Sequence, residues 1–96
     1  MAKDASISQL LSALKLDERG WTVVDHWEAD AFAIGIGVAT EPRRLVYVST
    51  FKKQAGRYDY ECELPTGQEE AEYDAVDRGQ DVTYEQLSSV LRQHLS

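Results

Sequence analysis

The spacing of apolar residues changes twice along this chain, and that change limits the fold more than any other feature. In residues 6–16 apolar side chains recur every three or four positions, as they do on one face of an α-helix. Residues 82–95 repeat this spacing, whereas residues 21–64 largely alternate apolar and polar side chains, which is typical of half-buried β-strands. The helical stripes are Ile7, Leu10, Leu11 and Leu14, and then Leu87, Val90, Leu91 and Leu95. The sequence therefore predicts an α+β fold with an amphipathic helix on each side of a sheet-forming region.

The middle of the chain predicts four strands, within residues 21–28, 31–39, 44–51 and 57–64. The segments that join them, EAD, TEPR and KKQAG, are short enough for hairpins, so we expect an antiparallel meander. Both helices can then cover one face of the sheet, in the order α-β-β-β-β-α. Residues 65–81 have no sustained period and are expected to form a loop of about fifteen residues.

The alternation also predicts which side chains form the core. The expected core residues are Trp21, Trp27, Phe32, Ile34, Ile36, Leu45, Tyr47 and Phe51. The other face is expected to show Thr22, Val24, His26, Val46, Val48, the Ala/Gly strip of residues 31–39 and the acids of the fourth strand. Capping-box spacing, Ser6 with Gln9 and Thr83 with Gln86, predicts where the helices begin, and Gly20 is a plausible stop for the first helix.

The length of the chain suits one core of two layers, so residues 1–96 are expected to form a single domain. The first twenty residues lack an apolar signal region, and no window resembles a membrane span, so a cytoplasmic protein with no membrane partner is expected. Cys62 is the only cysteine, which excludes an intramolecular disulfide and a cysteine-based metal cluster. We expect neither a metal nor a cofactor.

The negative charge of the chain is concentrated in one quarter of the sequence. Nine acids and one base lie between Asp59 and Asp81, a local charge of −8, while the other residues sum to +1. The opposite sign comes just before, at Arg43, Arg44, Lys52, Lys53 and Arg57. Such separation predicts a strongly dipolar molecule.

The acidic tract has two interpretations. A charge run is most often a solvated face that keeps a protein soluble. Concentrated like charges, however, cost stability, and this favours a partner of opposite sign, which disfavours nucleic acid. The candidate partner-binding residues are Asp59, Glu61, Glu63, Glu69, Glu70, Glu72, Tyr73, Asp74 and Asp77.

No motif in the sequence supports a specific reaction, and we expect the protein not to be an enzyme. HWE at residues 26–28 matches the H-x-E of zinc deaminases, but the required P-C-x-x-C is missing. GIG at residues 35–37 has Thr40 where a dinucleotide fingerprint needs its third glycine. Cys62 lies between two glutamates, which oppose thiolate formation, so a small buried hydrophobic role is expected.

The segments DHWEADAFAIGI, RRLVYVSTF and GRYDYECEL, with the acidic tail after them, resemble small acidic bacterial immunity proteins. These are cytoplasmic antidotes to polymorphic or contact-dependent inhibition toxins. The resemblance covers residues 21–64 and implies tight binding to one basic toxin domain, often a nuclease. Because these proteins share no universal signature, it assigns no functional residue.

Three other functions stay open at this point. The first is a homo-oligomeric adaptor, such as a homodimer, that pairs through the sheet face around Gly35 and Gly37. The second is a small hydrolase of unknown substrate. The third is a phosphate-backbone mimic that binds nucleic-acid-binding proteins generally.

Overall fold

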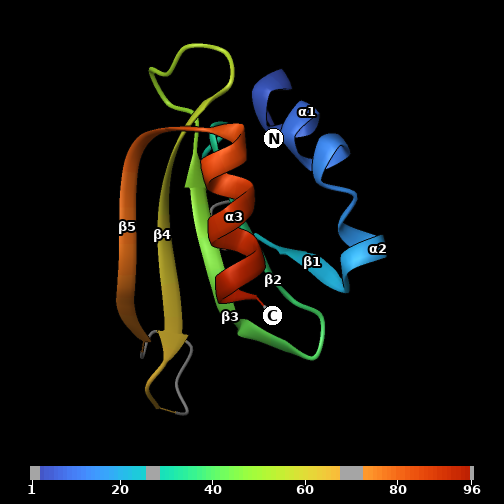
Figure 1. The fold of residues 1–96 in the computed structure, drawn as a ribbon, viewed down its shortest axis with the longest axis vertical. Coiled ribbons are helices and arrows are strands. Elements are labelled where there is room, and N and C mark those ends of the chain that lie inside the picture. Colours follow the sequence, from blue (N-terminus) through green and yellow to red (C-terminus); the bar gives the residue numbers. More distant parts are fainter. Residues whose placement is uncertain (1–2, 26–28, 68–72, 96) are drawn as a thin grey trace.

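The computed structural model describes residues 3–25, 29–67 and 73–95, which form one antiparallel sheet and three helices (Figure 1). The elements in chain order are α1 (Ala5–Leu14), α2 (Leu16–Arg19), β1 (Trp21–Val24), β2 (Ala33–Val38), β3 (Glu41–Ser49), β4 (Arg57–Pro65), β5 (Tyr73–Thr83) and α3 (Tyr84–His94). The strands lie in the order β1-β2-β3-β4-β5, and every neighbouring pair is antiparallel. The predicted α+β meander is confirmed. The predicted strand number is wrong, because the sheet has five strands rather than four.

The fifth strand is β5, in a region that the sequence predicted to be a loop. It pairs with β4 from Arg57↔Thr83 to Pro65↔Tyr73, but the register shifts twice, between Tyr58 and Tyr60 and between Cys62 and Glu63. Each shift places extra residues on β5, and extra residues reverse the alternation of side chains between the two faces. A strand interrupted in this way has no sustained period of two, and this explains why the sequence pattern missed it.

Both α1 and α3 cover the same face of the sheet. Their buried side chains share one core cluster with residues from four strands: Ile7, Leu10, Leu14, Trp21, Ile34, Ile36, Val46, Val48, Tyr58, Cys62, Leu87, Leu91 and Leu95. In Figure 1, α3 crosses in front of the sheet and α1 lies beside it. Each large apolar side chain removed from water contributes roughly 1.5–3 kcal/mol, so this layer supplies most of the stability.

The third strand presents the face opposite to the predicted one. Val46 pairs with Ile36 and Val48 with Ile34, so both valines point toward the helices and are fully buried. Tyr47 pairs with Gly35 on the other face, together with Leu45, which is also buried. Residues 45–48 are all apolar or aromatic, so the alternation did not determine which set faces the helices.

Phe32 and Phe51 were also predicted in the core, but Phe32 is half-buried outside the core cluster and Phe51 is 54% exposed. Phe51 lies just past the end of β3 and makes an edge-on contact with Phe32, with ring centroids 5.7 Å apart. Trp27, also predicted in the core, lies outside the described residues.

The start of α3 follows the sequence prediction, whereas the start of α1 does not. Thr83 and Gln86 form a capping box, with Gln86 N–H donating to Thr83 Oγ1 at 3.2 Å. The first helix is instead capped by Asp4, whose Oδ2 accepts from the N–H of Ser6 at 3.0 Å. It ends at Leu14, because Lys15 adopts a left-handed conformation, and Gly20 ends α2. None of the described helices has the length and apolar character needed to cross a membrane.

Candidate functional site

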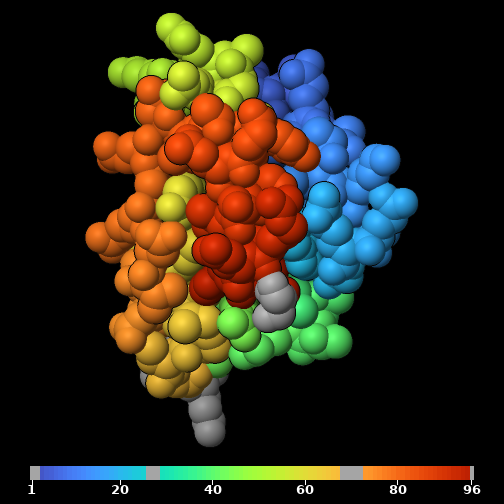
Figure 2. Space-filling view, viewed as in Figure 1, coloured from blue at the N-terminus to red at the C-terminus, as the bar shows by residue number. Residues whose placement is uncertain are grey.

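The acidic tract lies on two neighbouring strands at one side of the sheet. Residues 59–65 belong to β4 and residues 73–81 to β5, the strand at the end of the sheet order. In Figure 2, β5 forms one flank of the molecule. Glu69, Glu70 and Glu72 lie outside the described residues.

The sheet divides these acids between its two faces. Asp59, Glu61 and Glu63 pair across the strands with Ser49, Tyr47 and Leu45, on the face away from the helices. Asp77 pairs with the buried Cys62 and Asp74 with Leu64, on the helix side. The described members of the predicted partner-binding set therefore lie on both faces of the sheet, at β4 and β5. They do not form one flat acidic face.

Two of the acids on β4 are engaged by cations of the same molecule. Lys53 Nζ lies 3.0 Å from Asp59 Oδ1, and the same oxygen accepts from the N–H of Asp81 at 2.9 Å. Arg78 Nη2 lies 3.5 Å from Glu61 Oε1. Asp59 thus helps to hold the irregular part of β5, where Asp81 has a φ of 54°.

Glu63 is 8% exposed, so it adds little to the accessible surface of the site. Its backbone carbonyl lies 2.9 Å from His94 Nε2 in the last turn of α3. This contact ties the C-terminal end of α3 to β4. His94 therefore has a structural partner at the end of α3.

Tyr73, Asp74 and Asp77 are the exposed members of the candidate set on β5. Asp77 Oδ2 accepts from Tyr60 Oη at 3.0 Å. The Tyr60 ring lies across Gly79, where an added Cβ would overlap it and would be only 2.9 Å from Cδ2. Burial raises the pKa of Tyr60 to about 12, and the hydrogen bond to Asp77 adds to this shift.

The sequence missed the strand character of residues 73–83 and with it the edge that they form. Tyr73, Val76, Val82 and Thr83 are residues that strands favour. They could have indicated a strand, but their spacing of three, six and one matches no single alternation.

A small cavity of about 210 Å³ brings Cys62, Asp77 and His94 together with Val90 and Gln93. Burial, together with the charges of Asp77 and Glu61, raises the pKa of the Cys62 thiol to about 12. A protonated, buried thiol is a poor nucleophile at neutral pH. Among the residues with described positions, no group of three or more His, Cys, Asp or Glu side chains is placed to hold a metal ion.

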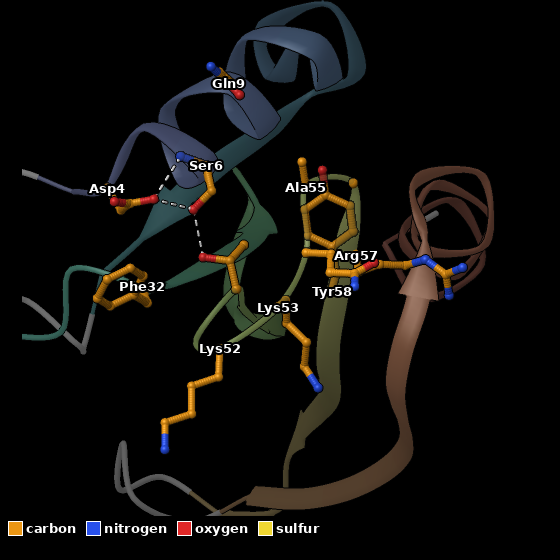
Figure 3. Close-up of a pocket in the computed structure, with 12 residues that line it drawn as sticks. Asp4, Ser6, Gln9, Phe32, Lys52, Lys53, Ala55, Arg57 and Tyr58 are labelled. Atoms are coloured by element: carbon orange, nitrogen blue, oxygen red, sulfur yellow. Dashed lines mark hydrogen bonds between the residues drawn. The ribbon is translucent and has the colours of Figure 1, made fainter.

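A second cavity, of about 300 Å³, lies between the start of α1 and the β3–β4 connection (Figure 3). Ser6 Oγ lies 2.7 Å from both Asp4 Oδ2 and Thr50 Oγ1, and the bond to Ser6 lowers the pKa of Asp4. The nearby cations are Lys52, Lys53 and Arg57, and Figure 3 shows their charged ends directed away from Ser6. The hydroxyl pair therefore joins α1 to the sheet, and the cations do not converge on it.

The glycine strip of β2 is filled by neighbouring groups. Gly35 and Gly37 are both buried, and a Cβ added to Gly37 would lie 2.9 Å from Val24 Cγ2 and 3.0 Å from the Pro42 carbonyl oxygen. A glycine within a strand often marks such a close approach, and this explains why Gly37 has no side chain. HWE at residues 26–28 lies outside the described residues.

Taken as chemistry, the arrangement offers exposed carboxylates beside a strand edge, which can attract cations and basic protein surfaces. Comparisons with protein-family models, with curated proteins and with solved structures give no match for this chain.

Proposed function

We propose that this protein is an antidote of the immunity-protein type, which binds and neutralises a cognate basic toxin domain, with a nuclease as the favoured target. One observation carries the proposal. The entire negative excess of the chain falls within residues 59–81, and the described acids of this tract lie on β4 and β5, at one side of the sheet. Solubility alone would be served as well by carboxylates spread over the surface.

The physical basis is electrostatic steering toward a positive cleft. A nuclease cleft attracts phosphates with Lys and Arg, so a cluster of carboxylates is drawn to the same field. Complementary potentials of this kind raise association rates to about 10⁸ M⁻¹s⁻¹ at low salt, compared with about 10⁵–10⁶ M⁻¹s⁻¹ for neutral surfaces. Since the screening length is about 8 Å at physiological ionic strength, association should slow steeply as salt rises.

Affinity would also need side chains that lose their water on binding. Tyr73 is 46% exposed and Val76 52% exposed, and both lie on β5 beside Asp74 and Asp77. An aromatic and an aliphatic side chain beside carboxylates form the kind of centre that protein interfaces use.

The test is a binding and inhibition assay with a basic toxin domain that the protein captures from lysate of its native host. The variant Glu61→Lys/Asp74→Lys reverses two accessible charges of the site, and Asp17→Lys/Glu18→Lys reverses two exposed charges on α2 as a matched control. We expect stoichiometric inhibition of the toxin activity. The site variant should associate about tenfold or more slowly, while the control associates normally. The stability of the site variant should fall by no more than about 1 kcal/mol, because the Glu61–Arg78 ion pair that it loses lies at the surface.

Two results would count against the proposal in different ways. Equal association rates for both variants would mean that the acids of β4 and β5 are only a solvated surface. Absence of inhibition at a tenfold or so excess over the toxin would reject the antidote function itself.

A further inference from the structure

The outer edge of β5 is the longest free strand edge that the structure describes. β5 has eleven residues and ends the sheet, whereas β1 at the opposite end has four. No described strand lies beyond β5, and Figure 1 shows it as the outermost element on its side. Every second residue of such a strand directs its backbone N–H and C=O away from the sheet, which makes the edge a template for another chain.

The charges on β5 decide which chain can use this template. The strand contains Asp74, Asp77, Asp81 and one base, Arg78, a formal charge of −2. A second copy of this protein would place the same excess opposite itself, and like charges opposite each other in a sheet are destabilising. A strand rich in Lys or Arg would instead place its charges beside these carboxylates.

The register shifts of β5 strengthen this selection. They interrupt the pairing of β5 with β4 at two points, and such bulges bend a strand and increase its twist. Bends and charges on an edge are the means by which proteins prevent unspecific pairing. The clearest stretch for a partner is Tyr73–Gly79, where the exposed Tyr73 and Val76 offer apolar contact beside Asp74 and Asp77.

We propose that the outer edge of β5 binds a basic, extended segment of the partner protein by adding it to the sheet as a further strand. This inference rests on the proposed antidote function and specifies how the same acidic site would hold its target. Backbone hydrogen bonds would supply affinity, and the carboxylates would select the charge of the added strand.

The first experiment titrates the ¹⁵N-labelled protein with three capped peptides of about nine residues, a length that matches the edge. One alternates Val with Lys, the second alternates Val with Glu, and the third repeats the Lys peptide with N-methyl groups along its central part, which removes its backbone donors. We expect the Lys peptide to shift the amide signals of residues 73–79 and to slow their hydrogen exchange. The Glu peptide should leave them unchanged, and N-methylation should weaken binding about tenfold or more.

A pair of substitutions at the exposed Val76 tests the same edge from the protein side. Val76→Pro places a ring on the edge at an irregular position that can accept proline, and Val76→Thr is the matched control that keeps the backbone donor. We expect Val76→Pro to lose peptide binding and Val76→Thr to retain it. If Val76→Pro does not fold, the methylated and unmethylated Lys peptides, compared on the natural protein, still test whether binding depends on backbone hydrogen bonds.

Three results would overturn the inference: unchanged β5 amide signals at millimolar Lys peptide, equal binding of the N-methylated peptide, or a salt-insensitive dimer whose protected amides lie in β5. Toxin inhibition separates this inference from the antidote function. A folded Val76→Pro variant that still inhibits fully would reject strand addition and leave the antidote function standing. Peptide binding at β5 without inhibition of the toxin would reject the antidote function and retain the edge site.

Discussion

Replacing Gly79 with alanine tests the contact that fixes β5 against β4. An added Cβ would lie 2.7 Å from Cζ and 2.9 Å from Cδ2 of Tyr60, closer than real Cβ atoms approach, so the ring would have to move. Gly79 is not among the positive-φ glycines, so alanine can adopt its backbone conformation. In the absence of this contact, alanine in a strand would stabilise the protein by about 0.5–1 kcal/mol relative to glycine.

The test therefore depends on whether Gly79→Ala raises or lowers the free energy of unfolding. Overpacking of this kind costs typically about 1–3 kcal/mol, which exceeds the backbone gain. We expect Gly79→Ala to lower the free energy of unfolding by roughly 1–2 kcal/mol, measured by urea denaturation at pH 7 with tryptophan fluorescence. The pKa of Tyr60 should also fall from about 12 toward its ordinary value, because the displaced ring loses burial and the bond to Asp77.

A double-mutant cycle with Tyr60→Ala isolates the contact. Once the ring is removed, Gly79→Ala should be neutral or slightly stabilising, so the two substitutions should show a coupling of about 1 kcal/mol or more. If Gly79→Ala stabilises the protein equally in both backgrounds, the ring does not lie on Gly79 and the reasoning fails.

Two further predictions concern alkaline stability and the face of β3. The folded pKa values of Tyr60 and Cys62 are raised to about 12 from 10.0 and 9.0, so the folded state keeps protons that the unfolded chain releases. The contribution of these two groups to the free energy of unfolding should be fully present below pH 9 and be lost as the pH rises toward 12. Urea midpoints that stay constant across this range would contradict the prediction. Val48→Ala should lower the free energy of unfolding by about 2 kcal/mol, against about 1 kcal/mol or less for Phe51→Ala; equal losses would contradict the observed faces.

The sequence alone determined the class of the fold and the apolar stripes of α1 and α3, but only the start of α3 was predicted correctly. Ile7, Leu10 and Leu14 are buried in α1, and Leu87 and Leu91 are buried in α3. The stripes were predicted correctly because a helical stripe depends on spacing within one segment. The capping box of α3 is local in the same sense.

The sequence identified the residues of the candidate site but not the faces of the sheet on which they lie. The acids of residues 59–77 were recognised by their concentration, yet only the cross-strand pairing determined that Asp77 faces the helices and Glu61 the opposite side. Pairing also decided that Asp59 is engaged by Lys53, a residue from the preceding connection. An ion pair of this kind depends on how the connection folds against the strand, so no spacing along the chain encodes it.

Tertiary structure alone decided which face of β3 is buried and that residues 73–83 form a strand. Val46 and Tyr47 are both acceptable core residues, and their faces were chosen by register with Ile36 and Gly35. An edge strand with exposed side chains and two register shifts leaves almost no period in the sequence, because it buries neither face completely and is held mainly by backbone hydrogen bonds to β4. The spacing of apolar residues in a segment indicates which of its side chains are buried. Only the assembled sheet determines which strand the segment pairs with.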